Sequence, residues 1–374
     1  MRKTYFSNGI LIMASFLLLI VSSCKKDKSA PTITDATPIK FAVYEQVDSS
    51  IYRQIFIPIP TIGTITLNDD FNALLFDTGS GGMVIDASGI LPSNLITSNG
   101  FNFTGDSTVY DGITVTNQTS TIQYGDDANL YTVYGNLAYA NVTIGVQGDG
   151  TITIKRLPFL LYYKATDNKG NVSPPHDFDV FGADPEYDLT FANNVNLQSP
   201  FNLYNPGTGL TKGFKIGPLG TSNFSDAYDL PLTPDVITLG LTASDLSSSS
   251  GFTMNNLQYD SRYGADPVMP GTINYNNEKI SANIVFDSGT AGYSYIEDNN
   301  AAKTTITLPQ GSTVSAALNS GFNYTYTTAP TEYLTYVENP SVSKIDVSIF
   351  SIDYFINNEY MLDYTDNRLG LKNN

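Results

Sequence analysis

The chain has 374 residues, with 36 acidic and 19 basic side chains and a formal net charge of −17. This length accommodates one large or two medium domains. The negative charge opposes binding to nucleic acid and to anionic lipid headgroups, so we expect no nucleic-acid partner. His176 is the sole histidine and Cys24 the sole cysteine, which excludes a zinc site made of several histidines and leaves Cys24 without a disulfide partner. We expect neither a metal nor a cofactor.

Hydrophobic residues make up 41% of the chain and charged residues only 15%, with 25 tyrosines, 20 phenylalanines and no tryptophan. Short apolar runs alternate with stretches rich in Asn, Thr, Ser and Gly, and there is no long heptad pattern. Apolar and aromatic runs separated by frequent turns are typical of strands. The composition therefore predicts an all-β protein.

The N-terminus has the features of a targeting segment. Arg2 and Lys3 precede an apolar run over residues 10–21, which is shorter than a membrane span requires. Small residues then precede Cys24, as in the bacterial lipoprotein cleavage site that this region resembles. We expect a signal peptide over residues 1–23 and a lipidated Cys24, which would anchor the protein to the outer membrane or cell surface by its lipid alone. The alternative is an ordinary signal peptide followed by an incidental cysteine.

A polar segment follows Cys24. It contains three lysines and then a Thr-, Ala- and Pro-rich stretch that ends near Pro38. This composition is typical of a solvated linker. We interpret residues 24–50 as the lipidated tether.

The first strands and the first acid motif come next. The pattern predicts strands over residues 52–60 and 63–67 and a turn at 68–70. The apolar run 73–76 then predicts a buried strand that leads into Asp77-Thr78-Gly79-Ser80-Gly81-Gly82. The glycines allow the backbone to approach the carboxylate closely. A further strand is expected over 83–85.

The same pattern returns over residues 282–292, where an apolar run ends in Asp287-Ser288-Gly289-Thr290. Taken singly, each motif is compatible with an Asx-type turn after a strand. The two copies lie 210 positions apart, and each follows an apolar strand that ends in phenylalanine. This repetition in the same context favours a functional pair.

The paired Asp-Thr-Gly-Ser and Asp-Ser-Gly-Thr motifs resemble the two catalytic loops of the two-lobed, pepsin-like aspartic proteases. The resemblance covers roughly residues 50 to 374 and is specific at the two motifs and at the C-terminal tail. It implies an all-β, double β-barrel with a cleft between an N-terminal lobe over 51–248 and a C-terminal lobe over 249–374. Residues 245–251, with four consecutive serines, are the candidate linker, and a monomer is expected.

The resemblance assigns roles to the two acids and their glycines. Asp77 and Asp287 would share one proton and hold a water molecule between them, because two adjacent carboxylates do not both ionise readily. The ionised partner would take a proton from the water while the protonated partner donates to the scissile carbonyl. Gly79 and Gly289 would donate backbone N–H groups to the carboxylates.

The resemblance also assigns roles to the four hydroxyl residues of the loops. Thr78 and Ser288 would hydrogen-bond across to the opposite loop. Ser80 and Thr290 would bond the outer carboxylate oxygens and tune their pKa values.

A hairpin over residues 120–139 resembles the one that closes over the cleft in this family and carries a Tyr-Gly pair at its tip. Tyr124 and Gly125 are therefore the candidate flap and substrate-binding residues. The alternative is that Tyr124 is a surface tyrosine in a strand. The family packs a tryptophan behind the flap tyrosine, and in this chain Val84 falls near that place.

Later segments extend the match. Residues 178–182 resemble the apolar-apolar-Gly strand behind the first catalytic loop, and residues 213–217 and 236–240 predict further strands. His176 is expected in a loop, because it follows Pro174-Pro175. The C-terminal segment after residue 347 resembles the tail of the family, except that Ser351 stands where a glycine is expected.

The sequence predicts a lipid-anchored aspartic endopeptidase that binds an extended peptide in a cleft between the lobes. One alternative is a catalytically silent binding or inhibitor protein on the same fold, favoured by Ser351 and the missing tryptophan. Another is an unrelated β-rich adhesin or glycan binder. The residues after Cys24 could also be an inhibitory prosegment, although they are short and only modestly basic.

Overall fold

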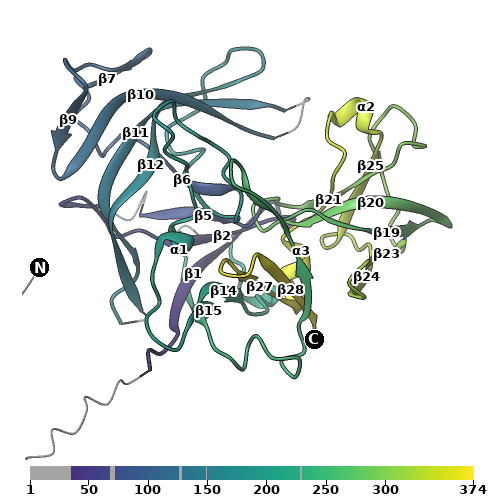
Figure 1. Ribbon diagram of the computed structural model, residues 1–374. Helices are drawn as coiled ribbons and strands as arrows, with labels where there is room; N and C mark the ends of the chain where they lie inside the picture. The colour runs from purple at the N-terminus through teal and green to yellow at the C-terminus, as the bar shows by residue number, and fades with distance from the viewer. Residues whose placement is uncertain (1–34, 68–71, 126–128, 149, 228–229) are drawn as a thin grey trace, which may run out of the picture. The chain divides into compact units, whose positions relative to one another are not determined.

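The computed structural model describes residues 35–67, 72–125, 129–148, 150–227 and 230–374 (Figure 1). The expected signal peptide, the lipidation site at Cys24, the first part of the tether and the turn expected at 68–70 lie outside the described residues. Within the described part of the chain, none of the helices is long and apolar enough to cross a membrane.

The fold is almost entirely β, as the composition predicts. A sixteen-stranded sheet contains nearly all strands that lie before residue 242, together with three strands that lie after residue 252. In spatial order its main path is β16 (Thr253–Asn256), β28 (Arg368–Asn373), β27 (Asn358–Asp363), β14 (Thr211–Ile216), β15 (Leu232–Leu241), β1 (Ile39–Asp48), β2 (Tyr52–Pro58), β5 (Ala73–Asp77), β13 (Val180–Ala183), β6 (Gly81–Asp86), β12 (Thr151–Asp167), β11 (Tyr131–Gly145), β10 (Ile113–Tyr124) and β9 (Ser107–Tyr110). Two short strands lie beside this path, β3 (Thr61–Ile62) and β4 (Ile65–Thr66).

A second, eight-stranded sheet is built from the second half of the chain. Its spatial order is β22 (Ile306–Thr307), β25 (Leu334–Glu338), β21 (Tyr293–Glu297), β26 (Ser348–Phe350), β20 (Glu278–Phe286), β19 (Met269–Tyr275), β23 (Thr313–Leu318) and β24 (Asn323–Thr327). The remaining elements are two small hairpins and four single helical turns: β7 (Ile96–Thr97) with β8 (Gly100–Phe101), β17 (Gln258–Asp260) with β18 (Gly264–Asp266), α1 (Pro200–Leu203), η1 (Thr221–Asn223), α2 (Pro340–Ser343) and α3 (Asp353–Asn357).

The two sheets contain the same three-strand arrangement. In the first, β13 lies between β5 and β6, parallel to β5 and antiparallel to β6. In the second, β26 lies between β20 and β21, again parallel to the first and antiparallel to the second. In each case the loop that joins the outer strands carries one of the two acid motifs, so the fold repeats itself around these loops.

The predicted tether is too long at its C-terminal end. Residues 39–48 form β1, which pairs with both β2 and β15. Phe41, Ala42 and Val43 in this strand are fully buried. The burial of these side chains stabilises an ordered strand here, whereas the lysine- and proline-rich composition that suggested a tether belongs to the residues before it.

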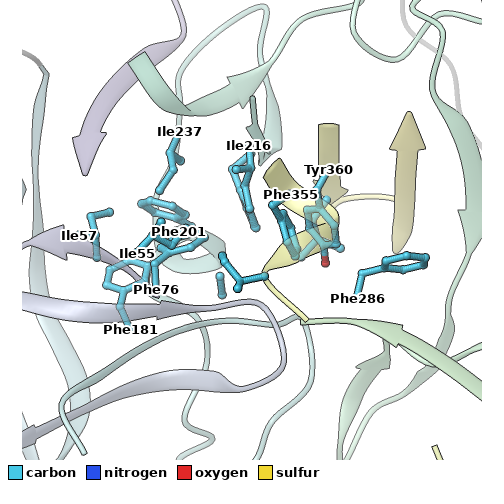
Figure 2. Close-up of a cluster of buried hydrophobic side chains, with 14 of the residues drawn as sticks. Ile55, Ile57, Phe76, Phe181, Phe201, Ile216, Ile237, Phe286, Phe355 and Tyr360 are labelled. Atoms are coloured by element: carbon cyan, nitrogen blue, oxygen red, sulfur yellow. The ribbon is translucent and has the colours of Figure 1, made fainter. Parts of the chain in front are cut away.

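The two acid motifs are supported by a continuous aromatic core (Figure 2). The phenylalanine before each acid stacks on the phenylalanine of the central strand, with ring centroids 5.6 Å apart for Phe76–Phe181 and 5.2 Å apart for Phe286–Phe350. Phe214 extends the cluster from the first pair towards the second. Its ring centroid lies 5.6 Å from that of Phe76 and 6.0 Å from that of Tyr360. Movement of either strand therefore disturbs close packing beneath both loops.

Candidate active site

The first acid lies where β5 ends, and Gly182 of β13 pairs with it. A Cβ on Gly182 would lie 2.5 Å from the backbone oxygen of Ser80, closer than atoms can pack. The glycine is therefore required because two backbone segments pass closely behind the loop. This close approach explains the glycine at the end of the 178–182 pattern.

The second acid lies directly after β20, and its amide donates to the Phe350 carbonyl at 2.8 Å. Ser351, which departs from the expected glycine, is fully buried beside this contact. Its amide donates to the hydroxyl of Ser294 at 3.1 Å, and the two serine hydroxyl oxygens lie 3.3 Å apart. The serine is accommodated because Ser294 supplies a hydrogen-bonding partner for it.

The structure brings the two acids together. Asp77 is 8% exposed, and the carboxyl group of Asp287 lies close enough to act on it directly. Each carboxyl group also lies against the glycine of the opposite loop. A Cβ on Gly79 would lie 2.6 Å from Cγ of Asp287, and a Cβ on Gly289 would lie 2.4 Å from Cγ of Asp77. The two carboxyl groups thus form a compact pair that only glycine can flank.

Within each loop the carboxylate is held by the same two hydrogen bonds. The Gly79 amide donates to Oδ1 of Asp77 at 2.7 Å, and the Ser80 hydroxyl donates to Oδ2 at 2.6 Å. In the second loop the Gly289 amide donates to Oδ1 of Asp287 at 2.7 Å, and the hydroxyl of Thr290 donates to Oδ2 at 2.5 Å. These donors restrict the rotation of both carboxyl groups.

Two residues join the loops to each other. The Thr78 amide donates to the Ser288 hydroxyl at 3.1 Å, and the amide of Ser288 donates to the Thr78 hydroxyl at 3.0 Å. Each hydroxyl donates in turn to a carbonyl of the opposite strand, at 3.1 Å to Phe286 and 2.8 Å to Phe76. The contacts are symmetric although one residue is threonine and the other serine, because both supply a hydroxyl.

The electrostatics of the pair follow from its burial. Burial disfavours the charged carboxylate of Asp77, and the adjacent carboxyl group of Asp287 adds like-charge repulsion, so the pKa of Asp77 is raised well above its usual range. The hydrogen bonds from Ser80 and Gly79 oppose this shift without cancelling it. A pair in this environment retains one proton at pH values where isolated carboxyl groups are ionised.

The pair lies in a groove of about 980 Å³ lined by residues of both lobes. The lining contains seven acidic residues and, among the described residues, neither lysine, arginine nor histidine. The acidic residues are Asp77, Asp177, Glu186, Asp188, Asp287, Glu297 and Glu338. The open groove can admit an extended chain, and its lining is negative along both sides.

The candidate flap residues lie at the same groove. Tyr124 ends β10, which pairs with β11 as a hairpin, and both Tyr124 and Gly125 line the groove with the two acids. The ring of Tyr124 stacks on Phe178 with centroids 5.9 Å apart and an interplanar angle of 12°. Val84 belongs to the apolar cluster against which both rings pack.

Two residues of the site have no signal in the sequence pattern. The sequence pattern predicts a strand that begins at Phe178, but the residue lies in the turn before β13, and its contact with the flap tyrosine has no signal in the sequence. Asp188 lines the groove and accepts a hydrogen bond from the amide of Gly81 at 2.8 Å. Burial raises the pKa of Asp188 to about 7. Both residues contact partners that are distant in the chain, so no local sequence pattern indicates these contacts.

His176 lies outside the groove lining. His176 lies in the loop before β13, as expected, and its Nδ1 lies 2.8 Å from Oδ2 of Asp179. Over the described ranges, no group of three or more His, Cys, Asp or Glu side chains is arranged to hold a metal ion.

Comparisons with known proteins give the fold. No family model matches the chain, and none of the curated proteins matches its sequence. Among solved structures, a crystal structure of an aspartic proteinase from Irpex lacteus is similar with a TM-score of 0.52 and 16% sequence identity. The match covers 90% of this chain and 97% of that one. The chain therefore has the two-lobed, all-β fold of the pepsin-like aspartic proteinases.

Proposed function

We propose that this protein is an aspartic endopeptidase that hydrolyses peptide bonds with a water molecule activated between Asp77 and Asp287. The observation that carries the proposal is the adjacent pair of carboxyl groups, flanked by symmetric donors, in a groove lined by residues of both lobes. The fold of the aspartic proteinase from Irpex lacteus supports the same assignment.

The chemistry follows from the shared proton. The ionised member of the pair accepts a proton from water, whose oxygen attacks the peptide carbonyl carbon. The protonated member gives its proton to the carbonyl oxygen, so that a tetrahedral diol forms without a covalent enzyme intermediate. Proton transfer to the amide nitrogen then allows the C–N bond to break. The donors to each carboxylate keep both groups in place throughout.

The structural departures from the family do not remove this machinery. Ser351 is matched by Ser294, and the hydroxyl of Ser288 makes the contacts that a threonine would make. A catalytically silent protein has no need to keep both acids together with all of their donors. This argument favours the enzyme over the silent binding protein.

The proposal includes the location. Residues 1–23 would direct export, and Cys24 would carry the lipid that holds the enzyme at the outer membrane or cell surface. The acidic groove would then act on extended peptides or unfolded proteins outside the cytoplasm. Mass spectrometry of the mature protein would show an acylated Cys24 as its first residue, whereas an unmodified Cys24 would contradict the anchor.

The activity test compares the full chain with Asp77→Asn and Asp287→Asn. An unfolded protein substrate is incubated with each at several pH values between 3 and 8, and the new termini are identified by mass spectrometry. We expect cleavage by the wild type, inhibition by a statyl-type transition-state mimic, and a loss of rate by about 10²–10⁴-fold or more in each variant. Thermal unfolding of both variants serves as the control for folding. A wild type that cleaves nothing across this range would contradict the enzyme.

A further inference from the structure

The flap tyrosine rests on a short segment, residues 176–179, that leads directly into β13. Phe178 of this segment lines the groove and stacks on Tyr124. It also contacts Tyr131, the partner of Tyr124 in the hairpin, with ring centroids 5.0 Å apart. One phenylalanine therefore supports both strands of the hairpin where they approach the catalytic carboxyl groups.

The segment is itself held by hydrogen bonds to the end of β6. Nδ1 of His176 lies 2.8 Å from Oδ2 of Asp179, and Oδ1 of Asp179 accepts the amide of Asp86 at 2.7 Å. The His176 amide donates to Oδ2 of Asp86 at 3.3 Å. Phe178 is tied down separately, because its amide donates to the hydroxyl of Tyr162 at 3.3 Å. We call His176, Asp179 and Asp86 the loop clamp.

The backbone at His176 needs such support. Its φ of 67° lies in the left-handed region, which most residues with a side chain avoid. The conformation persists where surrounding contacts fix it. The side-chain contact with Asp179 and the backbone contact with Asp86 both act on this one residue, two positions before Phe178.

The hydroxyl of Tyr124 lies within electrostatic reach of the catalytic pair. Burial raises the pKa of this tyrosine well above its usual range, and the carboxylates of Asp188, Asp77 and Asp179 add to the shift. Among the described residues this buried hydroxyl has no hydrogen-bonding partner. A displacement of Phe178 would move this donor relative to Asp77, and with it any peptide group that the hydroxyl binds.

We propose that His176 is a positioning residue: its contact with Asp179 fixes the 176–179 segment so that Phe178 holds Tyr124 in place over the catalytic pair. This role rests on the proposed function, since it concerns the same groove. In the described contacts His176 touches neither of the catalytic carboxyl groups, so we expect its effect to reach the reaction through Phe178 and Tyr124.

Protonation of the imidazole controls the strength of the clamp. Burial favours the neutral ring, but the hydrogen bond and charge of Asp179, with the charge of Asp86, outweigh it and raise the pKa of His176. Among the described residues, the charged and titratable groups that act on it include these two aspartates, and Tyr162 lies against Asp86. The charged contact needs a protonated imidazole and an ionised Asp179, whose pKa is raised by burial. The contact is therefore strongest at pH values between the pKa of Asp179 and that of His176, and it weakens both below and above this range.

The test uses His176→Asn in the full chain, because asparagine tolerates the left-handed conformation but cannot carry the positive charge. We expect the KM for a peptide substrate and the Kd for a statyl-type mimic to be about tenfold higher than in the wild type. Phe178→Leu should give the same change, and Phe178→Tyr, which keeps the ring, should not. The matched control is Lys40→Gln, which breaks a 2.7 Å ion pair with Asp235 elsewhere in the molecule.

Nuclear magnetic resonance gives a readout that does not depend on catalysis. The chain contains one histidine, so its ring signals report His176 alone. We expect its pKa above 6.5 in the wild type and lower in Asp179→Asn. We also expect a nuclear Overhauser contact between the rings of Phe178 and Tyr124 that His176→Asn abolishes. An unchanged KM, Kd and ring contact in His176→Asn would overturn the positioning role. A wild type that shows the ring contact but neither cleaves peptides nor binds the mimic would overturn the proposed function instead.

Discussion

Thr78 and Ser288 hydrogen-bond to each other in both directions, with each backbone amide donating to the other residue's hydroxyl at 3.1 and 3.0 Å. The same hydroxyls donate to the carbonyls that precede the two acids. Four hydrogen bonds therefore connect the two catalytic loops, and all of them lie in the buried interior between the lobes. They hold the carboxyl groups together without touching them.

Thr78→Val is expected to destabilise the protein strongly while preserving the shape of the side chain. It leaves the amide of Ser288 and the carbonyl of Phe286 buried without their partner, and each such group costs about 1–3 kcal/mol of unfolding free energy. Urea unfolding measures the change. Thr78→Ser keeps the hydroxyl and should cost much less. A loss in Thr78→Val no larger than that in Thr78→Ser would show that these hydrogen bonds contribute little to stability.

Gly289→Ala is expected to abolish activity even where the protein folds. Its Cβ would lie 2.4 Å from Cγ of Asp77, so the carboxyl group has to move. A displacement of about 1 Å in a catalytic group reduces the rate by roughly 10²-fold. The kcat of a peptide substrate measures this loss, and Gly217→Ala is the control, because its Cβ would find its nearest neighbour at an ordinary 3.8 Å. Full activity of Gly289→Ala would mean that the carboxyl groups need not be adjacent.

We expect the folded state to be most stable at acid pH. Burial raises the pKa of Glu45 to about 7 and that of Asp188 to about 7, from ordinary values of 4.5 and 3.8. Between these limits the folded protein binds protons that the unfolded chain releases, so the stabilisation is complete below about pH 4 and is lost as the pH rises towards about 7. The melting temperature should therefore fall across this range.

Glu45→Gln should flatten this pH dependence, because a neutral amide replaces the buried carboxyl group. The matched control is Asp235→Asn, at an exposed position in a surface ion pair. The control should leave the slope unchanged. A melting temperature that rises between pH 4 and pH 7 would contradict the protonated state of these buried acids.

Much of the site could be predicted from the sequence because its key contacts are local. Asp77 is bound by Gly79 and Ser80, two and three positions later, and the second loop repeats this spacing. Such contacts are encoded in the motif itself. The all-β fold was predictable for a similar reason, since short apolar runs and turn residues reflect local preferences.

Contacts between distant parts of the chain were not predictable in this way. Ser351 looked like a defect, because its partner Ser294 lies 57 positions away. The missing tryptophan left the flap without an expected support, whereas Phe178 provides one from the turn before β13. The tether predicted over residues 24–50 includes β1, because the pairing of β1 with β15 involves residues almost two hundred positions apart. Local composition carries no information about such partners.

The charge of the groove predicts a preference among peptide substrates. The acidic side chains that line it are not balanced by a basic residue among the described lining residues, so the groove attracts positive charge. We expect peptides that carry lysine or arginine near the scissile bond to be cleaved about tenfold faster than matched peptides with glutamate, at low salt. The ratio of kcat/KM values measures the preference, and added salt should reduce it because exposed charges are screened.

Glu338→Gln should weaken this preference. Glu338 lines the groove from the end of β25, and its Oε2 accepts the hydroxyl of Thr305 at 2.8 Å, which the glutamine oxygen can also accept. The substitution therefore removes charge with little change of shape. The preference should also increase as the pH rises towards about 7, where the Asp188 carboxyl group ionises. Asp235→Asn, far from the groove lining, should leave the ratio unchanged. A wild type that favours the glutamate peptides would show that the negative lining does not select the substrate.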